Sequence, residues 1–476
     1  MLYRGRVQHR RRTPVLGIVI MVAAAALVAG IGYVLFRVLL APRPKIVLAK
    51  PFQTVGRNAP LALDIAEPRY GVREVKVTIG QGADEKVVLE ESYDPPRPEV
   101  QVRWSPAQEK RFRMSEGPGK LQVRARAAKF GFFKGRGASL DQDFTARLVP
   151  PRLEVLTTQH YVNQGGCDMI VYKVTPASAD SGVLVGERFF RGFPLPGSKD
   201  PATRFAIFAY PYDVPAGTAV RLRARDEAGN ESLSAFWLKI FPKQFRTREL
   251  DLSDDFLNKV VPEIMSQTTS LQDQGDALKS YLLINRDLRK QNNQQLREMA
   301  GRSQERFLWS EPFRQLSNSQ VEAQFADHRI YKYQGEEVDR QDHLGYDLAT
   351  NANSPIAASN DGQVLMAEFF GIYGNTVVID HGYGLLSLYG HMSSFAVKAG
   401  DTVTRGQTIG QTGATGLAGG DHLHFSMILQ GEQVDAREWW DPHWIEDRIK
   451  AKLRQYGAAP AASASPRPSA SASPAG

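Results

Sequence analysis

The spacing of hydrophobic and polar positions changes several times along this chain, and each change predicts a different kind of element. Positions 14–36 form an uninterrupted run of 23 uncharged, mostly apolar residues. As a helix this run would be about 35 Å long, and the apolar core of a bilayer is about 30 Å thick. The pattern therefore predicts a transmembrane helix over residues 14–41.

The basic residues around this run predict its orientation. Five arginines precede it, and three basic residues follow it by position 45. This excess favours a cytoplasmic N-terminus. The run is longer than the apolar region of a cleaved signal peptide, and no A-x-A cleavage site follows it. We predict a cytoplasmic basic segment (1–13) and an uncleaved signal anchor that crosses the cytoplasmic membrane once. The bulk of the chain would then lie outside the cytoplasm, on the periplasmic or cell-wall side.

Strict alternation of apolar and polar residues follows the anchor and predicts half-buried strands. Two arginine-striped examples, at 121–127 and 220–225, lie about 100 residues apart. This spacing favours two successive immunoglobulin-like β-sandwich modules, 46–150 and 151–243. The arginines are expected to form solvated faces, with contact to an anionic wall polymer or lipid surface as the alternative.

From residue 252 the apolar spacing is helical. Ser253 with Asp254 and Asp255 forms an N-terminal cap signal, and a second helix is predicted from about 276 to 299. This helical hairpin, residues 250–305, is expected to be a packing element. The alternative hypothesis is that it covers the downstream site and gates it.

Strand-like sequence with frequent glycine returns over residues 309–450. The last stretch, 457–476, consists almost entirely of Ala, Ser, Pro and Gly. Such a composition cannot bury a core. We predict a β domain at 309–450 and a disordered tail at 457–476.

Two histidines stand one residue apart in the predicted strand GDHLHFSM, residues 420–427. Alternation places Leu423, Phe425 and Met427 on one face, which is expected to be core. His422 and His424 lie on the other face with their Cα atoms about 6 to 7 Å apart. The two imidazoles are therefore close enough to serve one bound species.

The net charge of +8 changes the picture little, because the first 45 residues hold eight basic residues and no acidic one. The remaining chain is formally neutral, so no nucleic-acid partner is predicted. Cys167 is the only cysteine, which excludes an intrachain disulfide. We expect it to be a small buried hydrophobic residue.

Histidines cluster in the C-terminal part of the chain, since five of the nine lie between positions 343 and 424. A catalytic zinc needs three nitrogen or oxygen ligands and an open position for water. His343, Asp347 and one of the two histidines at 422 and 424 would supply the ligands. The other histidine of that pair and His391 would remain free imidazoles.

These free imidazoles matter because zinc lowers the pKa of bound water to about 7. A neutral imidazole could accept or relay the proton, and a protonated one could stabilise an oxyanion. The H-E-x-x-H helix is missing from the sequence, so its glutamate base is missing too. The spare histidines are therefore the candidate bases.

Three segments, HLGYDLA, GNTVVIDHGYGLLSLYGHM and GQTIGQTGATGLAGGDHLHF, resemble the catalytic core of the lysostaphin/LytM-type zinc metallopeptidases. These enzymes cut peptides in peptidoglycan, and the resemblance covers about residues 321–435. It implies a small antiparallel β domain with one zinc ion per chain in an open groove. Its implied zinc ligands are His343, Asp347 and His424, and its implied catalytic residues are His391 and His422.

For other residues whose side chains could bind a ligand or catalyse a reaction, we predict structural roles. His381 matches a family position that is not a ligand and is expected to be structural, while His328 and His443 are expected at the surface or in packing. Residues 413–421 lack the lysine of a phosphate-binding loop and are expected to form a flexible groove wall. Three tryptophans are expected to close the domain edge, with stacking on sugar rings as the alternative: Trp439, Trp440 and Trp444.

The sequence therefore predicts a mainly β, multidomain protein with a transmembrane helix, two immunoglobulin-like modules, a helical segment and a C-terminal LytM-type peptidase domain. Its expected function is that of a membrane-tethered zinc endopeptidase acting on stem peptides or cross-links of peptidoglycan. The alternative is a non-catalytic wall-binding or hydrolase-activating regulator that uses the same groove. A regulatory protein partner fits either hypothesis, and a zinc peptidase acting on proteins would share the same site.

Overall fold

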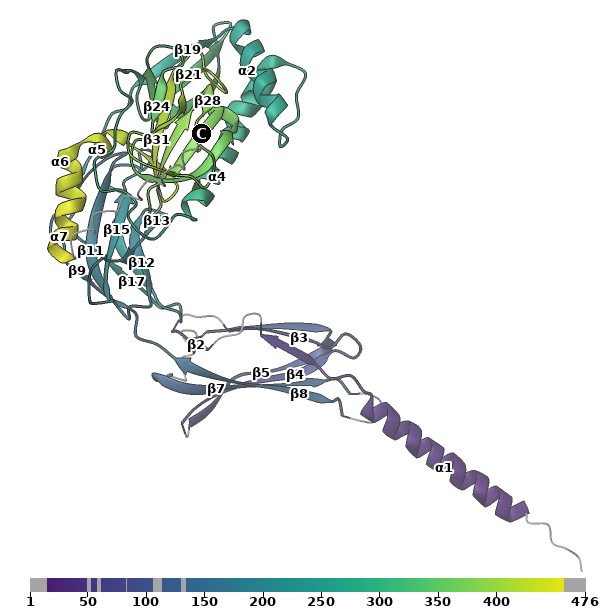
Figure 1. The fold of residues 1–476 in the computed structure, drawn as a ribbon. Helices are drawn as coiled ribbons and strands as arrows, with labels where there is room; N and C mark the ends of the chain where they lie inside the picture. Colours follow the sequence, from purple (N-terminus) through teal and green to yellow (C-terminus); the bar gives the residue numbers. More distant parts are fainter. Residues whose placement is uncertain are drawn as a thin grey trace, which may run out of the picture. The chain divides into compact units, whose positions relative to one another are not determined.

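The computed structural model describes residues 15–48, 53–57, 61–82, 84–105, 114–129 and 134–457. The predicted basic segment 1–13 and the predicted tail beyond residue 457 lie outside these ranges. The chain divides into two compact units, one of residues 1–150 with 227–230 and the other of residues 151–226 with 231–476. Strands dominate both units (Figure 1), which confirms the prediction of a mainly β protein.

The N-terminal apolar run forms helix α1 (Val15–Leu39). Among the residues that the structure describes, α1 is the one helix long and apolar enough to cross a membrane, over Gly17–Phe36. A signal sequence near the N-terminus has the same properties. The helix is thus compatible with the predicted anchor.

The rest of the first unit is built from two sheets. The smaller has the order β1 (Lys45–Leu48), β3 (Leu61–Ala66), β6 (Glu99–Trp104), and the larger has the order β2 (Thr54–Val55), β8 (Gly137–Ala146), β7 (Gly117–Ala127), β4 (Val72–Gln81), β5 (Asp84–Arg97). The apolar positions of 121–127 are buried, as their alternation predicts. Both sheets contribute to one hydrophobic core.

The second unit begins with a further set of strands. One sheet has the order β14 (Phe193–Pro194), β15 (Thr203–Ala209), β11 (Cys167–Thr175), β9 (Arg152–Val155). Another has the order β13 (Arg188–Arg191), β12 (Asp180–Val185), β16 (Val220–Arg225), β17 (Glu231–Ser234). In addition, β10 (Tyr161–Asn163) pairs in parallel with β18 (Lys239–Phe241). Cys167 is fully buried there, as predicted. The core of these strands continues without interruption into the C-terminal domain.

The C-terminal domain is centred on an eight-stranded sheet. Its order is β20 (Gln320–Ala323), β23 (Tyr346–Ala349), β31 (Leu423–Leu429), β27 (Leu385–Gly390), β26 (Asn375–Asp380), β25 (Gly362–Phe369), β29 (Thr402–Val403), and β32 (Glu432–Val434) also pairs with β31. One smaller sheet has the order β19 (Thr247–Leu252), β21 (Asp327–Tyr333), β22 (Glu336–His343). Another has the order β24 (Pro355–Ala357), β30 (Thr408–Gln411), β28 (Ser394–Phe395). Short helical turns η3 (Gly371–Tyr373), α5 (Ala436–Trp440), α6 (Pro442–Ile445), η4 (Glu446–Lys450) and α7 (Ala451–Tyr456) complete it.

The helical segment consists of α2 (Asp254–Gln267), α3 (Ala277–Leu283), the π-helical turn η2 (Ile284–Leu288) and α4 (Arg289–Ala300). The Ser253 hydroxyl accepts a hydrogen bond from the Phe256 amide at 3.2 Å and caps α2, as the sequence predicts. Apolar residues of these helices share a core with strands β26, β27 and β31 of the large sheet. The helices therefore cover one face of that sheet (Figure 1).

The central strand β31 is consequently buried on both faces. Leu423, Phe425 and Met427 point into the core shared with the preceding strands. Ile428 points into the core shared with the helices, and His424 and Ser426 are buried on that same face. The alternation read from the sequence is confirmed, and it directs His424 toward the site described next.

Candidate functional site

His343, Asp347 and His424 converge at one end of the large sheet. Antiparallel pairing of β23 with β31 places Asp347 directly opposite His424, and His343 is the last residue of β22. The three facing atoms are His343 Nε2, Asp347 Oδ1 and His424 Nδ1, and they lie 2.9–3.0 Å from one another. This group of buried nitrogen and oxygen atoms could hold a metal ion.

Both histidines of this group are held in one orientation by a second hydrogen bond. His343 Nδ1 lies 3.0 Å from the Gln324 carbonyl oxygen, which only accepts, so Nδ1 carries the proton. His424 Nε2 lies 3.0 Å from the Ser426 hydroxyl oxygen, which itself donates to the Leu344 carbonyl oxygen at 2.7 Å. Each ring therefore turns an unprotonated nitrogen toward Asp347, which is the orientation that metal-binding histidines adopt.

Gly345 is the glycine between the two residues of the HLGYD motif. A Cβ atom at this position would lie 2.6 Å from His424 Cε1 and Nε2 and from the Ser426 hydroxyl oxygen. Any other residue would displace the His424 ring. The glycine is thus explained by close approach of the chain to the site.

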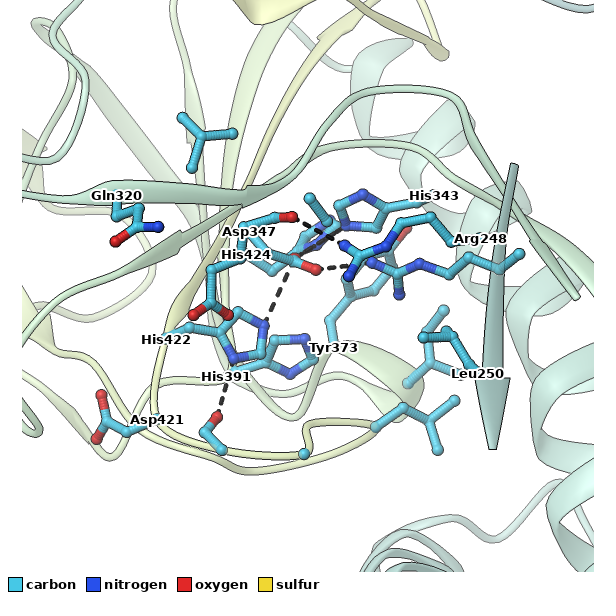
Figure 2. A pocket seen from close by; sticks show the side chains of 18 of the residues that line it. Arg248, Leu250, Gln320, His343, Asp347, Tyr373, His391, Asp421, His422 and His424 are labelled. Carbon is cyan, nitrogen blue, oxygen red and sulfur yellow. Dashed lines mark hydrogen bonds and ion pairs between the residues drawn. The ribbon is translucent and has the colours of Figure 1, made fainter. Parts of the chain in front are cut away.

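His391 and His422 lie beside this group without belonging to it. His391 follows β27 in a left-handed conformation with φ of 63°, and its Nδ1 donates to the Thr415 carbonyl oxygen at 2.8 Å. His422 precedes β31, and its Nδ1 donates to the Gly420 carbonyl oxygen at 2.9 Å. The two ring centroids lie 4.8 Å apart, and Figure 2 shows both rings side by side below His424. Both residues line the same groove.

Burial and neighbouring charges shift the pKa values of these groups in different directions. Burial lowers the pKa of His343 and lowers that of His424 to about 4. Burial, with His422 and His424 nearby, also holds the pKa of His391 well below its usual value. Burial alone would lower the pKa of His422, but the hydrogen bond and the charge of Asp347 outweigh it, so the pKa of His422 is raised. All but His422 thus favour the neutral imidazole, which is the form that binds metal.

Asp347 stays ionised in spite of its burial. Burial alone would raise its pKa, but the surrounding histidines hold it well below the usual range. In addition, the Arg329 guanidinium donates to Asp347 Oδ2 at 2.7 Å. One carboxylate oxygen is therefore held by Arg329, and the other faces the two histidines.

A groove of about 710 Å³ opens over these residues. One part of its lining was not foreseen from the sequence, because it comes from strands β19 and β21 and from the helical segment: Arg248, Leu250, Arg289 and Arg329. Tyr373 also lines it, with its ring centroid 5.3 Å from that of His424. The loop over 413–421 contributes Leu417, Gly419, Gly420 and Asp421, as expected for a groove wall.

His328, His381, His443 and the three tryptophans considered above do not line this groove. His381 is buried and bonded to the Asp361 carbonyl oxygen and the Ser387 hydroxyl group. His328 is exposed beside Asp342, and His443 is exposed as well. Trp439 is fully buried in the main core, and Trp440 and Trp444 pack against that core, so they close the domain edge.

Taken together, this β domain holds a central His-Asp-His group that could bind a metal ion, with two further imidazoles in its groove. Residues 341–436 match the model of peptidase family M23. The chain therefore carries an M23 (LytM-type) peptidase domain, and the resemblance to the lysostaphin/LytM family is confirmed.

Parts of this chain are similar to individual curated proteins and solved structures. The chain is 43% identical over 94 residues to the peptidoglycan DD-endopeptidase ShyA of Vibrio cholerae, a match that covers 20% of this chain and 22% of ShyA. It is 35% identical over 95 residues to the murein hydrolase activator EnvC of Escherichia coli, covering 20% and 23% respectively. The chain thus spans less than a quarter of the length of these curated relatives. The catalytic domain of lysostaphin from Staphylococcus simulans aligns with 30% of this chain and 96% of its own, at 23% identity and a TM-score of 0.20.

Proposed function

We propose that this protein is a zinc-dependent endopeptidase that hydrolyses peptide bonds in the stem peptides or cross-links of peptidoglycan. The observation that carries the proposal is the His343, Asp347 and His424 group, whose three facing atoms lie 2.9–3.0 Å apart. The match of residues 341–436 to the M23 family model and the likeness to a peptidoglycan endopeptidase support the substrate class.

The donor set fits zinc better than a hard cation. Two imidazole nitrogens and one carboxylate oxygen are typical of a catalytic zinc site with three protein ligands, whereas calcium and magnesium prefer oxygen atoms alone. Both rings present an unprotonated nitrogen because their other nitrogens donate to Gln324 and Ser426. One ion per chain would use His343, Asp347 and His424 as ligands.

A bound zinc ion would supply Lewis acidity toward the scissile carbonyl group and toward water. The residues of the chain would then handle protons and charge. His391 and His422 stand next to the three ligands, and each has its Nδ1 held by a backbone carbonyl oxygen. Each Nε2 atom could then accept a proton from water or stabilise negative charge on the substrate oxygen. His422 Nε2 also lies 3.5 Å from Asp347 Oδ1.

The N-terminal helix α1 would tether this domain to the cytoplasmic membrane, with the domain outside the cytoplasm. In this proposal the segments 46–150 and 151–243, as immunoglobulin-like modules, set the reach of the peptidase domain at 309–450 from the bilayer. The helical segment 250–305 would shape the groove. Charge distribution supports the orientation, because basic residues gather before the apolar run.

A second candidate function is that of a wall-binding or hydrolase-activating regulator. The similarity to the murein hydrolase activator EnvC favours it. The presence of all five residues, His343, Asp347, His391, His422 and His424, favours the enzyme instead, because a regulator does not need a complete set of ligands and free imidazoles.

The test uses the full chain in detergent micelles, since the core of the C-terminal domain extends into the strands from residue 153 onward. Zinc per chain is measured by metal analysis, and cut muropeptides are identified after incubation with purified peptidoglycan of defined cross-link chemistry. His424→Ala serves as the control that removes a ligand. One zinc per chain with cleavage that His424→Ala abolishes supports the proposal. Stoichiometric zinc without cleavage of any wall substrate would favour the regulator.

A further inference from the structure

Three arginines form one side of the groove, and all three lie outside the segment that matches the M23 family. Arg248 comes from β19, Arg329 from β21 and Arg289 from the first turn of α4. Parallel pairing of β19 with β21 places Arg248 directly beside Arg329. Two strands and a helix that precede the matched segment thus bring positive charge to its site.

Two of these three guanidinium groups have no carboxylate partner in the described part of the chain. Arg329 is engaged by Asp347. Arg248, in contrast, donates from Nη1 to the Glu322 carbonyl oxygen at 2.8 Å, and Arg289 donates to the backbone oxygen and the side-chain oxygen of Asn285 at 3.1 and 2.6 Å. A guanidinium group has five N–H donors, so both Arg248 and Arg289 keep donors and a full positive charge for a ligand.

One acidic residue of the groove, Asp421, lies away from Arg248. Figure 2 shows Asp421 and Arg248 on opposite sides of the His391 and His422 rings. Asp347 and Glu322 also line the groove, but Asp347 pairs with Arg329, and the Glu322 carbonyl oxygen accepts a hydrogen bond from Arg248. The Asp421 carboxylate is therefore not placed to neutralise Arg248.

Apolar side chains accompany the arginines. Leu250, Ile372 and Leu417 line the groove together with Arg248 and Arg289. Apolar neighbours reduce the screening of a charge by water. A carboxylate bound there would thus interact with the arginines more strongly than at an open surface.

We propose that Arg248 and Arg289 bind a free carboxylate group of the substrate peptide and thereby select peptides that carry one next to the scissile bond. Arginine pairs with carboxylates through two parallel hydrogen bonds, which gives geometric selectivity as well as attraction. This inference rests on the proposed function, because it places the carboxylate relative to the bond that is cut. Arg248 and Arg289 would act in substrate recognition, whereas His391 and His422 would act in the reaction itself.

The experiment compares two cross-linked stem-peptide dimers that are identical except that one bears a free side-chain carboxylate and the other the corresponding carboxamide. Binding to the zinc-loaded full chain in detergent is measured by fluorescence anisotropy, and cleavage is measured separately. The variants are Arg248→Gln and Arg289→Gln. Lys290→Gln is the matched control, because Lys290 is the exposed next residue on the same helix and does not line the groove.

We expect the original chain to bind the carboxylate peptide about ten- to hundredfold more tightly than the carboxamide, which is the range of a charge-assisted hydrogen bond. Each glutamine substitution should remove most of this preference and leave carboxamide binding unchanged, whereas Lys290→Gln should keep it. Arg289→Lys should restore part of the preference, because it returns the charge without the planar fork. The cleavage rates should differ mainly in KM.

Equal binding of the two peptides by the original chain would overturn the inference, as would a preference that survives both arginine substitutions. Because binding and cleavage are separate readouts, the proposed function can fail independently. A carboxylate preference that depends on Arg248 and Arg289, without cleavage of either peptide, would support the inference and overturn the peptidase. Cleavage of both peptides at equal kcat/KM would support the peptidase and overturn the inference.

Discussion

Arg329 donates a hydrogen bond to Oδ2 of Asp347 at 2.7 Å, while Oδ1 of the same carboxylate lies 2.9 Å from His343 Nε2. The two oxygens of Asp347 thus have separate partners. Arg329 is itself largely buried, with 20% of its side chain exposed. The pair fixes the direction of Asp347 before any metal binds.

The first prediction concerns this orienting role. Arg329→Gln should lower the affinity for zinc about ten- to hundredfold, which is the usual effect of losing a residue that orients a ligand. The measurement is a titration with zinc against a chromophoric chelator. Arg340→Gln is the control, since Arg340 lies on the neighbouring strand β22, pairs with Glu337 and is exposed. Unchanged zinc affinity in Arg329→Gln would show that Asp347 needs no such support.

The second prediction separates metal binding from turnover. His391→Ala and His422→Ala should each keep one zinc per chain and lose about 10²- to 10⁴-fold in turnover, the range expected for removal of a general acid or base. Neither ring has its Nε2 among the three converging ligand atoms. His443→Ala is the control, because that ring is exposed and lies outside the groove. Loss of zinc in either groove variant would instead make that residue a ligand.

Much of this site could be predicted from the sequence because its residues lie in short motifs. Alternation within β31 places His424 on one face and Leu423 and Phe425 on the other. Ser426 lies two residues after His424 and therefore on the same face, where its hydroxyl group bonds to His424 Nε2. Half-buried strands such as β7 and β16 could also be predicted, since their apolar and polar residues alternate.

The arginines of the groove could not be predicted in this way. Arg248 and Arg329 are 81 residues apart in the sequence and meet only because β19 pairs in parallel with β21. No local sequence pattern predicts such a long-range pairing. Arg289 reaches the groove because the helical segment packs on the large sheet through a shared apolar core. Periodicity indicates which face of a helix is buried, but it does not indicate which partner buries it.

The third prediction concerns the contact between α2 and the groove wall. Lys259 Nζ donates to the Ala418 carbonyl oxygen at 3.4 Å, and the Gly416 amide donates to Glu263 Oε1 at 3.3 Å. Net contributions of about 0.5–1.5 kcal/mol per hydrogen bond suggest a restrained but movable loop. Glu263→Ala with Lys259→Ala should therefore speed amide hydrogen exchange at residues 416–420 severalfold and raise KM.

The control for this contact is Glu298→Ala, since Glu298 is exposed on α4 and bonds only to Gln294 in the described chain. Point substitutions test the gating hypothesis more cleanly than deletion of residues 250–300, because deletion would expose the apolar core shared with β26, β27 and β31. If exchange and KM are the same in the double variant and the original chain, the helical segment does not control the loop.

The fourth prediction concerns a buried ion pair that ties the last helix to β11. Lys452 Nζ donates to Asp168 Oδ1 and to the Met169 carbonyl oxygen, both at 2.6 Å, and only 10% of the lysine side chain is exposed. Lys452→Met should destabilise the unit by about 3–5 kcal/mol, because the buried Asp168 carboxylate would lose its lysine partner. It would keep only the Tyr161 and Met169 amides and the His160 ring nitrogen at 3.3 Å. The measurement is urea unfolding of the full chain in detergent.

A second substitution tests the cause of this effect. Adding Asp168→Asn to Lys452→Met should recover part of the stability, since the buried negative charge is then removed. Arg454→Met, which breaks an exposed pair with Glu446, should cost less than about 1 kcal/mol. A double variant as unstable as Lys452→Met alone would assign the loss to packing and not to charge.

The last prediction follows from Glu438, a buried carboxyl group that accepts hydrogen bonds from the Cys167 amide at 2.6 Å and from Asn163 Nδ2 at 2.9 Å. Burial raises the pKa of Glu438 to about 7 in the folded chain. A folded-state pKa above the unfolded value means that folding favours the protonated acid. The contribution of Glu438 to stability is therefore complete below about pH 4.5 and is lost as the pH rises through about 7.

Between these two pH values the free energy of unfolding should fall by roughly 3 kcal/mol because of this group, at 1.36 kcal/mol per pKa unit. Glu438→Gln cannot ionise, so the difference between the original chain and this variant isolates the titration from all other groups. Urea unfolding followed through the fluorescence of the tryptophans, among them the adjacent buried Trp439, gives both curves. A difference that grows in favour of the original chain from pH 4.5 to 7 would mean that the two hydrogen bonds outweigh burial and that Glu438 is ionised when folded.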